Sequence, residues 1–134
     1  MTEMDEKDSF PINEKEVMDY YGYSGNYGRF KMRIKFFRGW ILHSLAYSSP
    51  LSNFCVKMQR LRGVTIGKNC HFNPYVLIDL VYPKMIEIGD NVTLGSHSMI
   101  FAHSNPSANL FLKQGDYPRK VEGVKIKSGA VINP

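Results

Sequence analysis

The sequence has few of the features that define membrane-spanning, secreted or disulfide-rich proteins. No apolar run approaches the roughly 20 residues of a membrane-spanning helix, and the best candidate, residues 39–47, is interrupted by His43. The acidic N-terminus MTEMDEKD argues against a secretory signal. The two cysteines, Cys55 and Cys70, form no C-x-x-C pair, so we expect reduced thiols in a cytoplasmic protein. A chain of 134 residues, 43% hydrophobic and 22% charged, is enough for one modest globular domain.

Acidic side chains are missing from the middle of the chain. Residues 29–62 contain eight basic residues and no acidic one, whereas residues 1–28 carry seven acids and two bases. Residues 63–134 are nearly balanced, with seven bases and five acids. The net charge of +5 therefore comes from one short segment. We divide the chain into an acidic, Tyr/Gly-rich segment (1–28), a basic helical segment (29–62) and a third part (63–134).

The basic segment has the period of amphipathic helices. Its apolar residues recur at helical spacing on one face, with Arg and Lys mostly elsewhere: Phe30, Ile34, Phe37, Ile41 and Leu45. The sequence SSP, residues 48–50, predicts a break before a second helix, and a short helix is expected near residues 14–20. We expect the apolar face to cover the open end of a neighbouring core. Peripheral binding to an anionic membrane through residues 29–47 stays open as an alternative, and no nucleic-acid-binding motif is present.

Residues 63–134 repeat their apolar residues every six positions. From residue 66 the units read IGKNCH, FNPYVL and ID; from 88, IGDNVT, LGSHSM and IFAH; from 126, IKSGAV and INP. The first position is always Ile, Phe or Leu, and the fifth is small or β-branched. A period of six fits neither an α-helix nor an alternating strand.

A triangular coil of three short strands explains this period, since each side of the coil then consumes six residues. The large apolar residue points inward, and Gly, Asn and Asp take the turn conformations at the corners. Hexapeptide repeats are a recognised sign of a parallel β-helix. We therefore predict a mainly β fold, a parallel β-helix in the form of a three-sided prism, preceded by N-terminal α-helices.

The repeats resemble those of the hexapeptide-repeat acyltransferases, in the branch of the galactoside, maltose and streptogramin acetyltransferases. The resemblance rests on IGKNCHFNPYVLID, IEIGDNVTLGSHSMIFAHSNP and IKSGAVINP, which together cover nearly all of residues 63–134. It implies a left-handed β-helix, a homotrimer, and acetyl-CoA bound in a groove between neighbouring prisms. The acetyl group would pass to a hydroxyl of a sugar or a similar small acceptor. Relatives continue with further coils after the position of AVINP, so the resemblance implies an incomplete β-helix domain.

The family's catalytic histidine follows an IGDNV coil, at the start of a loop that interrupts the repeat. His103, in IFAHSNP, holds that place here, and the loop would span about 104–120. Imidazole titrates near neutrality, so it can take the acceptor's proton during attack and return one to the departing CoA thiolate. The resemblance thus implies that His103 is the general base.

Other site residues follow from the same resemblance. Asn73 matches an asparagine that contacts the acceptor, and Asp79 could orient His103 or bind the acceptor. Asn105, beside the histidine, could also bind the acceptor. Ser128 matches a small residue near the pantetheine arm of the cofactor. Each of these has a structural alternative as a corner, turn or loop residue, and no metal site is expected.

Two other functions remain open at this point. Carbonic anhydrases of the gamma class share the prism and bind zinc through three histidines, and His71, His97 and His103 are available here. The separation of His97 and His103 is one residue longer than that class requires, and zinc tolerates little geometric error. The second alternative is a non-catalytic trimeric scaffold. His43, which interrupts an apolar helix, is expected to pack rather than react.

Overall fold

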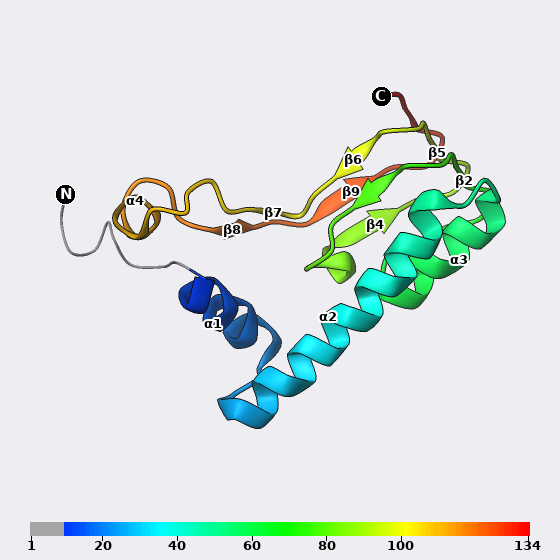
Figure 1. Ribbon diagram of the computed structural model, residues 1–134. Helices are drawn as coiled ribbons and strands as arrows, with labels where there is room; N and C mark the ends of the chain where they lie inside the picture. Colours follow the sequence, from blue (N-terminus) through cyan, green and yellow to red (C-terminus); the bar gives the residue numbers. More distant parts are fainter. Residues whose placement is uncertain (1–9) are drawn as a thin grey trace. The chain divides into compact units, whose positions relative to one another are not determined.

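The computed structural model describes residues 10–134 (Figure 1). The chain forms two compact units. Unit 1 contains the residues up to Lys35 together with His103–Val121, and unit 2 contains Phe36–Ala102 together with Glu122–Pro134. The acidic stretch MTEMDEKD lies outside the described residues.

Unit 1 combines helical segments with one antiparallel strand pair. Helix α1 (Phe10–Tyr21) contains the short helix expected near residues 14–20 but is longer than expected. The first part of helix α2 (Gly25–Ser48) also belongs to this unit. Strands β7 (His103–Ser104) and β8 (Lys120–Val121) pair antiparallel. The segment between them contains the short helix α4 (Leu110–Gln114).

Ion pairs connect α1 to the rest of unit 1. Glu14 accepts from the guanidinium groups of Arg29, at 2.7 Å, and Arg33, at 3.0 Å. One carboxylate of the N-terminal segment thus pairs with two of the bases at the start of α2. Because the arginine side chains are about half exposed, these ion pairs hold α1 beside the start of α2 but contribute little to the free energy of folding.

In unit 2, the remainder of α2 is followed by helix α3 (Ser52–Arg62), as the break at SSP predicts. Gly63 ends α3 in the left-handed region, with φ of 111°. Its N–H and that of Val64 donate to carbonyls of the last turn, a helix ending that favours glycine. Helix α3 then packs against the first two strands of the unit.

The remaining strands are two or three residues long and pair in parallel. One sheet has the order β1 (Thr65–Ile66), β4 (Ile86–Ile88), β9 (Val124–Ile126). A second has the order β10 (Val131–Ile132), β5 (Thr93–Leu94), β2 (His71–Phe72), and β3 (Leu77–Ile78) pairs with β6 (Met99–Ile100). Thr65 pairs with Glu87, His71 with Thr93 and Leu77 with Met99. In each of the three sheets, the same number of residues along the chain therefore separates the two paired residues. A 3₁₀ turn, η1 (Pro83–Met85), leads into β4.

The six-residue repeat correctly predicts which side chains are buried in unit 2. The first residues of the repeat units form much of its core: Ile66, Phe72, Ile78, Ile88, Leu94, Ile100 and Ile126. Residues at the fifth position are buried as well, among them Cys70 and Val92. In the turns between consecutive strands, Asn69 and Asn91 adopt positive φ values of 56° and 57°, as expected for turn asparagines.

The predicted fold class, however, is wrong. The described residues are 44% helical and 18% strand, so the protein is a mixed α/β chain and not a mainly β one. Within residues 10–134 the strands form small separate parallel sheets and one hairpin, with no closed or solenoid sheet. The left-handed parallel β-helix is therefore not observed. The segment expected as a loop, about 104–120, belongs to a different compact unit and contains the short helix α4 between the paired strands β7 and β8.

The orientation of α2 also differs from the expectation. The apolar face that was predicted to cover a core is exposed, including Phe30, Phe37 and Leu45. The side chains that α2 buries lie on the opposite face and include Met32, His43 and Ala46. A helical period identifies two faces, but it does not decide which one packs when the inner face uses small or polar residues.

Candidate functional site

His103 is the first residue of β7, and its backbone is fixed by pairing with Val121 of β8. The imidazole is half-buried. The strand pair brings the two ends of the segment 105–119 together, so that segment leaves and returns beside the histidine. A histidine held on a paired strand at the base of a long connection suits general acid–base chemistry, which requires a positioned group that a substrate can reach.

Asp79 is fully buried in unit 2 and accepts hydrogen bonds from three backbone N–H groups. One carboxylate oxygen accepts from Val81, at 2.8 Å, and Tyr82, at 3.1 Å, and closes the turn after β3. The other accepts from Ala102, at 2.8 Å. All three donors belong to unit 2, so Asp79 closes a turn and ties two segments within that unit. Its burial does not support the predicted direct contact with an acceptor, and the predicted orientation of His103 stays a prediction.

Asn105 lies in a polar network of unit 1. Its carbonyl oxygen accepts from the Lys113 ammonium at 2.8 Å, and its amide nitrogen donates to the side chain of Asn13 at 3.3 Å. Lys113 is buried and also forms an ion pair with Glu16 at 3.0 Å. A buried ammonium needs such partners, because desolvation without them is costly. Asn105 therefore serves the docking of α4 on α1, and its predicted role toward an acceptor stays a prediction.

Asn73 is exposed after β2, and its backbone N–H donates to the Leu94 carbonyl at 3.0 Å. The side chain is on the surface of unit 2, where a ligand could reach it. Its predicted contact with an acceptor stays a prediction.

Ser128 lines a groove of about 400 Å³ on the sheet β1–β4–β9. Its hydroxyl accepts from the backbone N–H of Asp90 at 2.9 Å. A side chain at Gly89 would meet Ser128 at 2.6 Å, so glycine is required for this close approach. The other walls of the groove include Thr65, Glu87, Lys125 and Lys127. The predicted cofactor residue thus lies in a surface groove with two lysines, which sequence reasoning had not assigned to a site.

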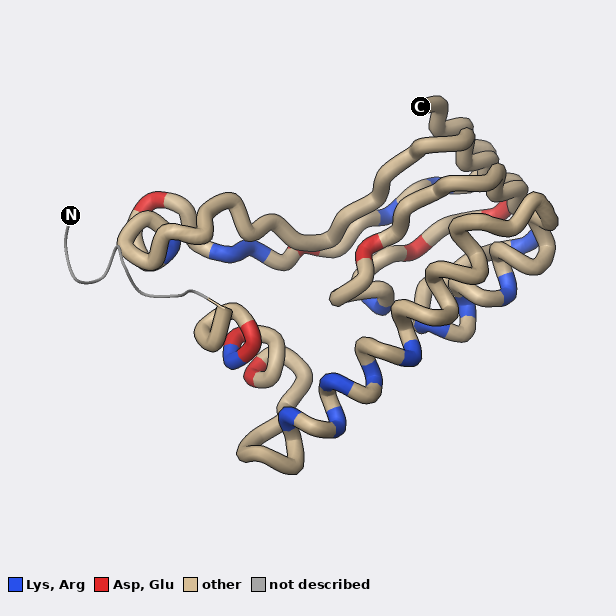
Figure 2. Tube along the Cα trace, viewed as in Figure 1, with Lys and Arg blue, Asp and Glu red and all other residues tan. Residues whose placement is uncertain are grey.

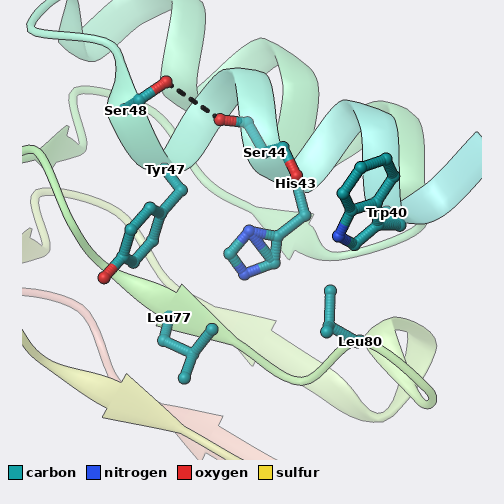
Figure 3. A pocket seen from close by; sticks show the side chains of 7 residues that line it. All are labelled: Trp40, His43, Ser44, Tyr47, Ser48, Leu77 and Leu80. Atoms are coloured by element: carbon teal, nitrogen blue, oxygen red, sulfur yellow. Dashed lines mark hydrogen bonds between the residues drawn. The ribbon is translucent and has the colours of Figure 1, made fainter.

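A second cavity, of about 390 Å³, lies between α2 and the strand β3 (Figure 3). Its lining is mostly apolar and aromatic: Trp40, His43, Ser44, Tyr47, Ser48, Leu77 and Leu80. The Ser48 hydroxyl donates to the Ser44 carbonyl at 3.1 Å, so its hydrogen bond is made to the backbone of its own helix (Figure 3). Nothing in this lining supplies a charged group for a polar reaction.

His43 lies against this cavity as a buried hydrogen-bond acceptor. Its Nε2 accepts from the backbone N–H of Ile78 at 3.2 Å. Burial, and secondarily the positive charge of Arg62, lower the pKa of His43 to about 4. The imidazole is therefore neutral near pH 7 and joins α2 to β3, which confirms the expectation that His43 packs.

The histidines considered for zinc are not part of a metal-binding cluster. Among the described residues no group of three or more His, Cys, Asp and Glu side chains could hold a metal ion. His97 stacks on Tyr75, with ring centroids 5.5 Å apart, and His71 is exposed on β2.

Two features of the site escaped sequence reasoning. Asp79 precedes LVYP, and an aspartate directly before a turn commonly accepts from backbone N–H groups two and three residues on. That signal was present in the sequence and predicts the observed cap. Lys125 and Lys127 lie two residues apart at β9, so strand alternation alone places them on one face, whereas the position of Glu87 beside Lys125 depends on the pairing of β4 with β9.

Comparison with known proteins does not assign the chain to a family. No family model, no curated protein and no solved structure matches it.

Proposed function

We propose that this protein is an acyl-CoA-dependent O-acetyltransferase in which His103 is the general base. The proposal rests chiefly on one observation: an imidazole held half-buried on a paired strand, at the base of a long connecting segment. It stands on this local chemistry and on the repeat motifs, and not on the β-helix fold, which the chain does not adopt.

The reaction would proceed by direct transfer. His103 takes the proton of the acceptor hydroxyl while that oxygen attacks the thioester carbon of acetyl-CoA. The carbon–sulfur bond then breaks, and the imidazolium returns its proton to the CoA thiolate. The products are the acetyl ester and free CoA. A sugar or similar small polyol supplies a suitable hydroxyl.

The groove lined by Ser128 contains side chains that can bind the cofactor. CoA carries phosphate groups, and the ammonium groups of Lys125 and Lys127 can bind them as point charges. The Lys125 side chain is well exposed and lies 3.8 Å from Glu87, a weak surface pair that a phosphate can replace. We assign this groove of unit 2 to the phosphate groups of CoA, as the repeat motifs suggest for Ser128.

Substitution of the proposed base tests this function. His103→Ala should lower the release of free CoA, measured with a thiol reagent over a panel of sugar acceptors, by about 10²–10⁴-fold. Binding of acetyl-CoA should be largely kept, because the base acts on the acceptor.

His71→Ala is the matched control, since His71 is an exposed histidine on β2. It should leave turnover unchanged. Unchanged turnover in His103→Ala would remove His103 from the mechanism. Turnover lost equally in both variants would show a general effect of removing a surface imidazole.

A further inference from the structure

Helix α2 carries an apolar stripe that the described residues leave largely exposed, and Trp40, at its edge, also lines the cavity beside β3. Its six large side chains are between 39% and 61% exposed: Phe30, Ile34, Phe37, Trp40, Ile41 and Leu45. They recur at helical spacing along most of the 24-residue helix. Phe37 and Trp40 stack on each other, with ring centroids 6.0 Å apart. An apolar stripe of this length marks an interaction surface rather than scattered exposure.

The stripe is not the packing face of the helix. Met32, His43 and Ala46 are buried on the opposite side, at 2–3% exposure. His43 also accepts the hydrogen bond from Ile78 that connects this side to β3. Because α2 already has a packed inner face, rotating it to bury the stripe would expose that face. The described residues therefore leave the stripe largely uncovered.

Basic residues flank the stripe. Figure 2 shows Lys and Arg following one another along α2. On a helical wheel, Lys31 and Arg38 border one side of the stripe, and Arg29 and Arg33 border the other. Residues 29–62 contain no acidic side chain that would oppose an anionic surface. Glu14 pairs with the two arginines, so the side with Lys31 and Arg38 carries most of the unneutralised charge.

We propose that α2 lies along an anionic lipid surface, with the stripe inserted among the acyl chains and the flanking bases at the headgroups. An interfacial helix needs this combination of aromatic and aliphatic residues on one face with Lys and Arg beside them. Trp prefers the headgroup level, and long basic side chains reach outward to lipid phosphates. No helix of the described residues is long and apolar enough to cross a bilayer, so the helix lies in the surface plane.

A second copy of this chain is a poorer occupant. Packing two copies through the stripe would bring the bases of one α2 beside those of the other. Like charges brought together oppose association, whereas lipid phosphates compensate the same charges.

Vesicle binding of the full chain tests the proposal. Trp40 is the sole tryptophan, so its fluorescence reports only on α2. On vesicles of phosphatidylcholine that contain phosphatidylglycerol as the anionic lipid, the emission should shift to the blue and be quenched by brominated acyl chains. Pure phosphatidylcholine should bind much less, and added salt should weaken binding.

Two variants separate the apolar and the charged contributions. Ile34→Ser with Ile41→Ser should abolish sedimentation with anionic vesicles. Lys31→Gln with Arg38→Gln should lower the partition coefficient on the order of tenfold. The charge-matched control, Lys68→Gln with Lys120→Gln, removes the same charge outside α2 and should leave partitioning within about twofold. Circular dichroism of each variant verifies that it is folded.

The proposal is overturned if the folded chain does not sediment with anionic vesicles, or if the control pair weakens binding as much as the α2 pair. It is also overturned if light scattering shows a dimer that only the Ile34/Ile41 variant loses while vesicles have no effect, because the stripe then binds a second copy. The proposal does not depend on acetyl transfer, and the vesicle assay contains no acyl-CoA, so either proposal can fail without the other.

Discussion

His43 shows how a single buried side chain makes stability depend on pH. Because its pKa is lowered from 6.5 to about 4, the unfolded chain binds a proton more readily than the folded one. The stabilisation from the neutral imidazole is complete above about pH 6.5 and is lost progressively as the pH falls toward 4. The free energy of unfolding should therefore drop by about 3 kcal/mol over this interval through His43 alone. Urea denaturation of the wild type and of His43→Gln at several pH values isolates this contribution as the difference between the two.

His71→Gln, which removes an exposed histidine instead of the buried one, is the matched control. Equal pH dependence in the wild type and His43→Gln would show that His43 does not titrate with a lowered pKa.

At the scale of single residues, the candidate site could be predicted from the sequence only in part. Sequence motifs single out His103, and the structure places it on a paired strand. They could not show that Asp79 is fully buried under three backbone N–H donors, or that Asn105 contacts Lys113 and Asn13. Those partners come from distant parts of the chain, so their proximity depends on tertiary structure.

Among the elements, the turns that follow β1 and β4 pack closely against each other at Gly67 and Gly89. A Cβ at Gly67 would collide with the Asp90 carboxylate and lie 2.7 Å from the backbone of Gly89. Gly67→Ala should therefore lower the free energy of unfolding by about 1–3 kcal/mol through overpacking. Gly39→Ala, in α2, meets no atom within 4 Å and should be neutral or stabilising by up to about 1 kcal/mol. Urea denaturation of the pair measures both effects, and equal stability would contradict the close packing at Gly67.

The elements also show what a sequence period can and cannot predict. The six-residue repeat correctly indicates strands beginning near residues 65, 71 and 77, and it identifies Phe72 and Ile78 as core residues. It does not determine how the strands join, and the separate small sheets differ from the predicted β-helix. The period of α2 likewise located its apolar stripe but not the face that packs. That choice depends on His43 and Ala46, which a hydrophobic pattern does not select.

At the scale of the whole molecule, charge and chemistry are distributed unevenly along the chain. The bases concentrate in residues 29–62, where we propose lipid binding, while the repeats hold the groove that we assign to the cofactor. Enzymes that modify substrates at a membrane surface benefit from such a division, because surface attachment raises the local concentration of the acceptor.

Calorimetric titration of the full chain with acetyl-CoA tests the central claim most directly. The account predicts saturable binding of about one molecule per chain, weakened by Lys125→Gln with Lys127→Gln and kept in the charge-matched pair Lys68→Gln with Lys120→Gln. Absence of saturable binding by a sample that circular dichroism shows to be folded would contradict acyl-CoA-dependent transfer.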